Sequence, residues 1–475
     1  MFDEMRGDDG ECREIYRKVN DWLRNTSGEV FERRRLEADA LFRRIGITFA
    51  VYGEGGDPER LIPFDPVPRI IDEDEWSFLA VGLAQRARAL NLFLRDVYHG
   101  RDIVRASIVP ENLIVQNKAF MQEMQGFDVP GDIYTHIVGI DLVRTGQQEF
   151  YVLEDNCRTP SGVSYMLENR EVMMRLFPDL FRTHKVEPIS HYPEELLATL
   201  REATPPNCDG DPVVAILTPG SFNSAYYEHS FLADEMGIEL VEGSDLLVDN
   251  NIVHLRTTEG LRRVDVIYRR IDDDFVDPLA FDPTSMIGVP GLFNAYRAGN
   301  VTLANAVGAG IGDDKSIYRY VPKMIEFYLG ETAILNNVPT HDCSKADDLS
   351  YVLDNLHELV VKEVHGSGGY GMLVGPAASR EELADFRAVL AARPHDYIAQ
   401  PTLALSTSPT FVDAGIAPRH VDLRPFVLVG KEVRITPGGL TRVALREGSL
   451  VVNSSQGGGT KDTWVLKNSA AVGAK

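Results

Sequence analysis

Cysteine is scarce in this chain, and the four cysteines form no pattern. Cys12, Cys157, Cys208 and Cys343 are scattered over 475 residues without the close spacing of a metal site. Isolated cysteines argue against a disulfide framework and favour a reducing compartment. The first residues are acidic and lack the apolar stretch of a signal peptide, so we expect a cytoplasmic protein.

Basic residues are also in short supply. The chain has 48 Lys and Arg against 71 Asp and Glu, which gives a net charge of −23. This surplus repels polyanions, so we expect neither nucleic acid nor an anionic membrane as the main partner. Long apolar runs are missing as well: no stretch approaches the roughly 20 residues that cross a bilayer. A polyanionic ligand would therefore need a local basic site.

The length predicts two or three domains, and the local patterns suggest where they lie. We expect a mostly helical region over 1–110, with an amphipathic helix over 75–100, and a β-rich segment over 111–190. Residues 191–211 carry several prolines and are interpreted as a linker. An α/β domain with a small parallel sheet is predicted over 205–310, because strand and helix patterns alternate there. The remainder, 311–475, is expected to form a further unit.

A glycine-rich turn between two apolar strands is the most informative motif. Lys362 lies on the first strand, and the turn runs from His365 to Gly371. Glycines let backbone N–H groups approach an anion closely, and the lysine adds a point charge. The segment after the turn is too short and too β-like for the helix that a Walker loop needs. The motif is either a hairpin that closes over nucleotide phosphates or an ordinary glycine turn.

A second motif combines oxygen ligands with a guanidinium. Glu154 and Asn156 are two residues apart at a strand end, so both side chains point to one face. Carboxylate and amide oxygens suit Mg²⁺, which also takes phosphate oxygens. Arg158 continues the alternation and could hold a carboxylate or phosphate. The alternative is a surface hairpin that simply ends in polar residues.

The strand that ends in Glu154 and Asn156 is predicted to form a hairpin with the preceding strand, which carries Asp141. The register of this hairpin decides whether Asp141 joins the same site. With a four-residue turn over 146–149, Asp141 lies opposite Glu154, with Cβ atoms roughly 5 Å apart. A tighter register would move the two carboxylates about 13 Å apart along the strand. The sequence leaves both registers open.

Two weaker signals complete the set. Gly312-Asp-Asp-Lys315 can cap a following helix, and Lys315 then lies in the first turn, where a cation is unfavourable for the helix. Contact with phosphate is one reason for it; an ordinary solvated lysine is the other. The short apolar strand 396–400 ends at Gln400, and such a strand can offer backbone groups to an adenine edge.

Together these motifs resemble the ATP-grasp superfamily, which clamps ATP between two α+β lobes. The metal hairpin precedes the glycine turn, the reverse of the usual order, and this resembles the circularly permuted type 2 members and the synthetase domain of glutathionylspermidine synthase. The resemblance covers about residues 70–468. It implies a mixed α/β and α+β fold: a permuted ATP-grasp fold with an α/β pre-ATP-grasp domain.

The resemblance also implies residue roles. ATP would be bound by Lys315, Lys362, Gly366, Ser367, Gly368, Gly369, Gly371 and Gln400. Asp141, Glu154 and Asn156 would hold Mg²⁺, and Arg158, Arg424 and Arg442 would act on phosphates or an acyl-phosphate. Arg269 and Arg270 would meet a substrate carboxylate. The loop Gly457–Lys461 is either a second anion site or a flexible tail.

The activity implied is ATP- and Mg²⁺-dependent ligation of a carboxylate to an amine or thiol through an acyl-phosphate. The partners would be a small-molecule or peptide carboxylate and an amine acceptor. Two alternatives stay open. One is a phosphotransferase or ATP hydrolase built on the same clamp, and the other is a nucleotide-binding partner protein without catalysis.

Overall fold

The computed structural model describes residues 2–7, 10–50, 59–366, 371–452 and 457–467. Its helices are α1 (Arg17–Asn25), α2 (Gly28–Ile45), α3 (Glu73–Tyr98), α4 (Asp102–Arg105), α5 (Asn112–Val115), α6 (Val163–Leu176), α7 (Pro178–Thr183), α8 (Tyr192–Glu202), α9 (Tyr226–Met236), α10 (Leu292–Arg297), α11 (Lys315–Tyr318), α12 (Val321–Leu329), α13 (Ala346–Asn355) and α14 (Arg380–Ala392). Within the described residues, no helix combines the length and apolarity that a bilayer crossing requires.

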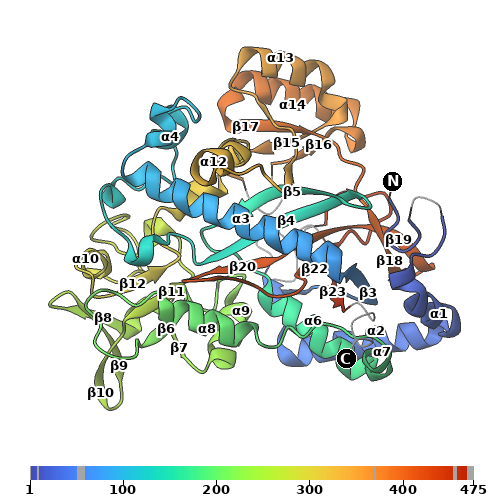
Figure 1. The fold of residues 1–475 in the computed structure, drawn as a ribbon, viewed down its shortest axis with the longest axis horizontal. Helices are drawn as coiled ribbons and strands as arrows, with labels where there is room; N and C mark the ends of the chain where they lie inside the picture. The colour runs from blue at the N-terminus through green and yellow to red at the C-terminus, as the bar shows by residue number, and fades with distance from the viewer. Residues whose placement is uncertain (1, 8–9, 51–58, 367–370, 453–456, 468–475) are drawn as a thin grey trace.

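A large mixed sheet forms the centre of the molecule (Figure 1). Its main path runs β13 (Asn336–Asn337), β5 (Glu149–Asn156), β4 (Ile137–Gly146), β19 (Gly415–Arg424), β22 (Leu440–Val443), β23 (Gly459–Leu466) and β3 (Phe64–Asp72). Three more strands attach to this path: β18 (Thr407–Val412), β20 (Phe426–Val429) and β21 (Val433–Ile435). Segments from both ends of the chain therefore build one sheet.

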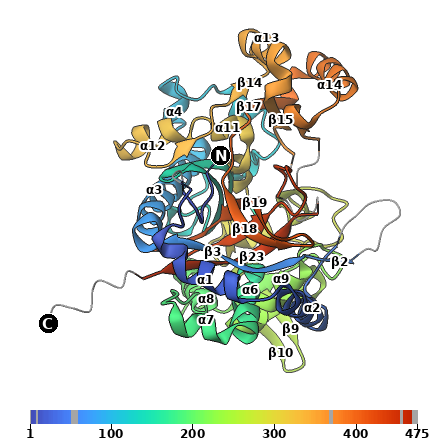
Figure 2. The same ribbon diagram turned by 90° about the vertical axis from the view of Figure 1, so that its right-hand side faces the viewer.

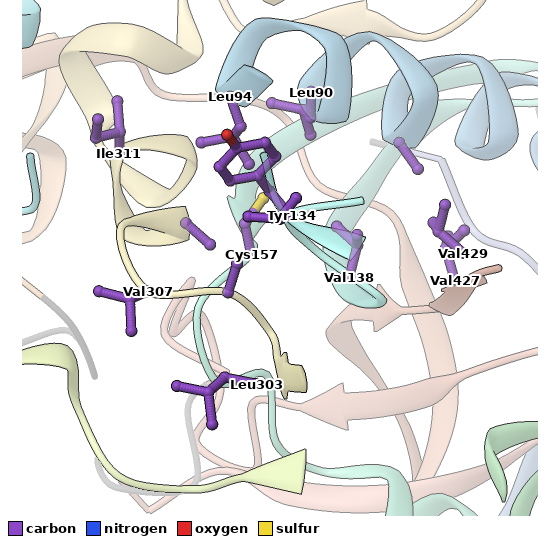
Figure 3. Packing of buried hydrophobic residues seen from close by; sticks show 14 of the residues in the cluster. Leu90, Leu94, Tyr134, Val138, Cys157, Leu303, Val307, Ile311, Val427 and Val429 are labelled. Carbon is purple, nitrogen blue, oxygen red and sulfur yellow. The ribbon is translucent and has the colours of Figure 1, made fainter. Parts of the chain in front are cut away.

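Helices cover both faces of the large sheet (Figure 1 and Figure 2), and Figure 3 shows part of the core under α3. Val427 and Val429 belong to the core under α3, together with Leu90, whereas Phe426 and Leu428 belong to the core on the other face. Successive residues of a strand point to opposite faces, so a strand buried on both faces reads as a continuous apolar run. Figure 2 shows α6, α7 and α8 grouped below β3 and β23.

The predicted parallel sheet of the 205–310 segment is confirmed. Its strands are β12 (Thr302–Ala304), β11 (Val266–Arg269), β6 (Val214–Leu217) and β7 (Glu239–Val241), all paired in parallel. A small antiparallel sheet of β8 (Leu246–Asp249), β9 (Ile252–Thr257) and β10 (Gly260–Arg263) extends from it, and the short pair β1 (Thr48–Ala50) and β2 (Glu59–Leu61) lies near the N-terminus.

The strands on either side of the glycine-rich turn belong to a small separate lobe at the top of Figure 1. Its sheet runs β14 (His341–Asp342), β17 (Tyr397–Pro401), β15 (Leu359–Glu363) and β16 (Leu373–Val374), covered by α13 and α14. This lobe has its own apolar core, which includes Val352, Leu356 and Leu390. The predicted strand–turn–strand order is confirmed, because β15 pairs antiparallel with β16.

One sequence-based expectation is wrong. The proposed linker contains α8, whose Pro193 lies in the first turn, where the missing N–H would have no intrahelical partner, and whose Leu196 and Leu200 are buried. The mostly helical N-terminal region also contains β3, a strand that Pro66 and Pro68 disguise in the sequence. Proline is tolerated there because β3 is the edge strand of the sheet.

The Gly457–Lys461 loop is also corrected. Lys461 lies in β23, is fully buried, and its Nζ is 2.6 Å from Oδ2 of Asp65. Its charge is thus committed inside the sheet and is not available to a second anion. We conclude that Lys461 has a structural role.

Candidate functional site

Two cavities meet at a shared wall. The larger, about 930 Å³, is bounded by residues of the central sheet, of the α/β domain and of the loop before α11. The smaller, about 150 Å³, lies between the small lobe and the central sheet. Glu154, Lys315, Gly366 and Arg442 line both cavities. Most of the residues that the sequence singled out therefore lie in one place.

The β4–β5 hairpin has the register that brings Asp141 opposite Glu154. Gly146 pairs with Glu149 at the turn, and Asp141 pairs with Glu154 further along. Between them are two bulges, one after Arg144 and one after Asp141, which shift the pairing by one residue in opposite directions. The two shifts cancel, so the carboxylates share a position on the sheet despite the irregular strands.

Two guanidinium groups enclose Asp141. Its Oδ1 accepts from Nε of Arg424 at 2.5 Å, and its Oδ2 accepts from Nη2 of Arg424 at 2.7 Å and from Nη2 of Arg442 at 2.6 Å. Burial by itself would raise the pKa of Asp141, but the two arginines outweigh it and hold that pKa well below its ordinary value. Asp141 is therefore ionised, and it orients both arginines.

Glu154 and Asn156 face the larger cavity more openly. Glu154 keeps about 29% of its side chain exposed and lies 3.4 Å from Nζ of Lys315 and 3.8 Å from Nη2 of Arg424. Asn156 donates its amide N–H to the carbonyl of Gly139 at 3.2 Å, which directs its own oxygen elsewhere. These oxygens fit a hard cation such as Mg²⁺.

The protein alone does not build a complete metal cage. Among the described residues, no group of three His, Cys, Asp or Glu side chains is arranged to hold a metal ion. Mg²⁺ usually keeps waters and takes phosphate oxygens alongside one or two carboxylates. The donor set present therefore fits a metal that arrives with a phosphate ligand.

Lys362 supplies a partly buried positive charge to the smaller cavity. Its Nζ donates to Oε1 of Gln400 at 2.9 Å, and Gln400 in turn donates to the hydroxyl of Thr340 at 3.0 Å. Burial lowers the pKa of Lys362 to about 8, although the nearby Glu154 carboxylate opposes the shift. Its direct partner is an amide, not a carboxylate, so the charge suits an anionic ligand.

Lys315 connects the central sheet to the glycine turn. Asp314 caps α11 as predicted, accepting from the N–H groups of Ser316 and Ile317. The Nζ of Lys315 donates to the carbonyl of Gly366 at 2.7 Å and lies beside Glu154. Gly371 has φ +67°, a conformation that favours glycine. Ser367, Gly368 and Gly369 lie outside the described residues.

Arg158 and Arg270 line the larger cavity, and Arg269 does not. Arg158 lies 3.4 Å from Asp272 and 3.8 Å from Asp313 and is partly exposed. Arg270 donates to the carbonyl of Pro160 at 2.7 Å and is almost fully buried.

The prediction that Arg269 meets a substrate is corrected. Its side chain is fully buried and donates to the carbonyls of Asn305, Ile271 and Ala306, and it pairs with Asp273. These contacts commit the guanidinium to the protein interior. We assign Arg269 to holding the α/β domain together.

Cys157 is part of the packing and is not a nucleophile. Figure 3 shows it among apolar side chains between α3 and the segment that carries Val307 and Ile311. Burial raises the pKa of its thiol well above the ordinary value, so the reactive thiolate is suppressed.

Several cavity residues were not predicted. His365, Asp313, Asn223 and Tyr165 all line the larger cavity. A signal existed for the first two, because His365 directly precedes the glycines and Asp313 precedes the capping Asp314. Asn223 and Tyr165 reach the cavity only through the packing of the α/β domain against α6, which no local pattern reveals.

Residues 68–444 match the family described as circularly permuted ATP-grasp, type 2. The match covers most of the chain, including the β4–β5 hairpin, the glycine turn, Arg424 on β19 and Arg442 on β22. The chain belongs to this family. The rotated order of hairpin and turn is a property of these ATP-grasp proteins.

Related sequences extend over the whole chain. An uncharacterized protein of Synechocystis is 51% identical over 99% of this chain and 98% of its own length, and one of Mycobacterium tuberculosis is 50% identical over the full chain and 85% of its own length. A Frankia casuarinae protein with the provisional name glutamate–cysteine ligase 2-2 is 43% identical over 98% of this chain. The chain spans only about 53% of that larger protein.

A solved structure supports the ATP-grasp fold. The glutathione synthetase-like effector of Globodera pallida, in its apo form, covers 93% of this chain and 98% of its own, with a TM-score of 0.57. Its sequence identity is 11%, so the likeness concerns the fold alone.

Proposed function

We propose that this ATP-grasp protein is an ATP- and Mg²⁺-dependent ligase that joins a carboxylate to an amine through an acyl-phosphate and releases ADP. The observation that carries the proposal is the wall between the two cavities. Lys315, Arg424 and Arg442 converge there on Glu154 and Asp141, with Lys362 beside them. A site for phosphoryl transfer needs such fixed positive charge, because the transition state spreads negative charge over the phosphoryl oxygens.

The two cavities suggest a division of labour. The smaller one, lined by Val338, Val360 and Leu403 with Gln400 at its polar end, suits an adenine ring. The larger one would hold the acid and the amine, with Arg158 and Arg270 as candidates for a substrate carboxylate. Glu154 and Asn156 would hold Mg²⁺, which neutralises phosphate charge when bound, while Asp141, whose oxygens accept from two guanidiniums, would orient the arginines.

The side chains of the site then have roles in nucleotide binding, in phosphoryl transfer and in protection of the acyl-phosphate. Lys315 and Lys362 hold the nucleotide phosphates, and Arg424 and Arg442, oriented by Asp141, face the phosphoryl group as the substrate carboxylate attacks it. Holding the substrate carboxylate in line with the phosphoryl group converts a bimolecular step into an effectively unimolecular one. The glycine turn between β15 and β16 would exclude water, so that the acyl-phosphate reacts with the amine instead of hydrolysing.

The experiment is to measure ADP and phosphate release with Mg²⁺ and ATP against a panel of carboxylates and amines. Hydroxylamine serves as a general acceptor, because it traps acyl-phosphates as hydroxamates. We expect turnover that requires both an acid and an acceptor. Phosphate release without an acid would indicate an ATP hydrolase, and phosphate on an alcohol acceptor a phosphotransferase. ATP binding without turnover in any arm would mean a non-catalytic partner protein.

The site assignment has its own test. Glu154→Ala and Lys362→Ala should each weaken Mg²⁺-ATP affinity, measured by calorimetry, because each removes a group on the wall of the nucleotide cavity. His395→Gln, an exposed change in the same lobe, is the control. Unchanged affinity in both alanine variants would contradict the residue roles.

A further inference from the structure

The ligase reaction needs a proton acceptor that the groups above do not supply. An amine is an ammonium ion at neutral pH and has no lone pair until it loses a proton. Arginines are poor acceptors, the lysines are assigned to the phosphates, and Asp141 is enclosed by guanidiniums. Glu154 lies 3.4 Å from Nζ of Lys315 and is assigned to the metal. A general base must therefore face the larger cavity, where the amine would bind.

His365 faces that cavity with one ring nitrogen held in place. It lines the larger cavity, and about 45% of its side chain is exposed. Its Nδ1 lies 3.2 Å from Oδ2 of Asp314. A carboxylate at Nδ1 favours the tautomer with the proton on Nδ1, so that Nε2 carries the lone pair.

Asp314 is a rigid support for the imidazole. It is buried, its Oδ2 also accepts from Nδ2 of Asn117 at 2.9 Å, and its Oδ1 accepts from the N–H of Ser316 at 2.8 Å as the cap of α11. Hydrogen bonds to the charged form, led by that from His365, lower the pKa of Asp314 against the effect of burial, which by itself would raise it. Asp314 therefore stays ionised and can stabilise a protonated His365.

The position of His365 is tied to the phosphate-binding groups. The next residue, Gly366, accepts from Nζ of Lys315 at 2.7 Å, and Lys315 lies 3.4 Å from Glu154. The imidazole thus sits at the edge of the charged cluster where the acyl-phosphate would form.

We propose that His365 is the general base of the second half-reaction and that Asp314 is its positioning residue, an inference that rests on the ligase function proposed above. The ammonium group of the acceptor gives one proton to Nε2 of His365. The freed lone pair forms the C–N bond to the acyl carbon, and the C–O bond to phosphate breaks with its electron pair leaving on phosphate. The second proton of the nitrogen goes to the departing phosphate, and His365 returns its proton to solvent.

Among the other titratable groups on the cavity wall, the second histidine and Asp313 fit this role less well. His229 is only about 1% exposed, its Nδ1 is engaged with the hydroxyl of Thr218 at 2.9 Å, and burial lowers its pKa to about 2. Asp313 already accepts from the backbone N–H groups of Cys157 and Arg158 and pairs with the Arg158 side chain. His365 combines exposure to the cavity with a buried carboxylate behind it.

The test uses two acceptors that differ in basicity. Hydroxylamine is mostly unprotonated at neutral pH and needs no base, whereas an ordinary amine is protonated. With an acid and an amine that turn over in the panel, His365→Gln should slow amide formation by about 10²-fold or more. The same variant should form hydroxamate at close to the wild-type rate, with unchanged Mg²⁺-ATP affinity. In His365→Ala, added imidazole should restore part of the amide rate.

The controls separate this role from a structural one. His395→Gln should leave both acceptors unaffected. If His365→Gln slows the reactions with both acceptors equally, the residue only supports the glycine turn. If it slows neither reaction, no general base is present at this position. Either result overturns the inference. Asp314→Asn should also slow amide formation while leaving the rate of hydroxamate formation close to that of the wild type. Absence of wild-type turnover with any acid, including with hydroxylamine, overturns the ligase proposal itself.

Discussion

At the residue scale, the cavity wall is defined by charges whose partners lie far apart in the sequence. Asp141 on β4 holds Arg424 on β19 and Arg442 on β22, and Glu154 on β5 meets Lys315 at the start of α11. Each ion pair closes a large loop of chain. The strength of these ion pairs depends on how far they are shielded from water, and that shielding comes from several segments of the chain.

The lowered pKa of Lys362 predicts a pH effect on nucleotide binding. Burial, partly opposed by Glu154, sets this pKa at about 8, so the lysine loses its charge as the pH rises through about 8. ATP affinity of the wild type should therefore fall from about pH 7 to about pH 9 by calorimetry. Lys362→Met should bind more weakly at the lower pH and show little further loss. A wild-type affinity that is flat over this range would contradict a phosphate contact.

The raised pKa of Asp313, which is also caused by burial, predicts a pH effect on stability. Burial raises its pKa from 3.8 to about 7, against the nearby Arg158. The folded state therefore holds a proton that the unfolded state has lost between about pH 4 and pH 7, so this contribution to stability falls as the pH rises through that window. Asp313→Asn removes it. Relative to the variant, the wild type should lose free energy of unfolding between about pH 4 and pH 7 in urea titrations; parallel curves would refute the shift.

Asp141 and Glu154 face each other but should respond differently to mutation. Asp141→Asn removes the buried anion that Arg424 and Arg442 share and should cost about 3 kcal/mol in the free energy of unfolding. Arg442 keeps a second buried partner, Asp422, so the loss lies at the low end for a broken buried ion pair. Glu154→Gln, at a more exposed position, should change stability by less than about 1 kcal/mol and weaken Mg²⁺-ATP binding. Equal costs in denaturant would show that the two carboxylates share one structural role.

At the element scale, the site depends on two hairpins, of which β4–β5 is irregular. The paired bulges of β4–β5 restore the register that places Asp141 opposite Glu154. The second hairpin, β15–β16, brings Lys362 and Gly366 toward the same wall. Strand periodicity predicts which face a side chain takes, but a bulge changes the count by one residue, so register had to be seen in the structure.

Gly371 tests the second hairpin. Its φ of +67° disfavours any side chain, and a Cβ there would come within 2.9 Å of the Glu363 carboxyl carbon. Gly371→Ala should cost about 1–2 kcal/mol in stability and weaken ATP binding, as measured by urea unfolding and calorimetry. Gly28→Ala is the matched control, because nothing lies within 4 Å of that position and its φ is not positive. Equal effects of the two changes would show that the turn is not constrained.

At the scale of the whole molecule, nucleotide should hold the small lobe against the central sheet. The smaller cavity is lined by Lys362 and Gln400 from the lobe and by Asp141 and Arg442 from the sheet. A ligand that binds only the folded state adds about 2.7 kcal/mol of stability at 100 times its Kd. Mg²⁺-ATP should therefore raise the Tm in a thermal shift assay, and EDTA should reduce the increase. No shift at saturating Mg²⁺-ATP would contradict nucleotide binding between the lobes.

Local signals predicted the local parts of this fold well. The amphipathic pattern around Trp76 and Leu94, the cap at Asp314 and the strand–turn–strand at Lys362 correspond to α3, α11 and β15–β16. Predictions failed where packing overrides composition. The prolines of β3 are acceptable only at a sheet edge. Arg269 can be buried because carbonyl groups such as that of Asn305 accept hydrogen bonds from its guanidinium.

The sequence by itself determined the family, the rotated order of the motifs and the charged residues that line both cavities, because each motif is short and its chemistry depends on neighbouring residues. Only the tertiary structure decided how those motifs meet. It set the register of β4 and β5, placed Arg270 on the cavity and Arg269 in the core, and brought His365 onto Asp314. These outcomes depend on contacts between segments far apart in the chain, whose geometry follows from the packing of the whole core.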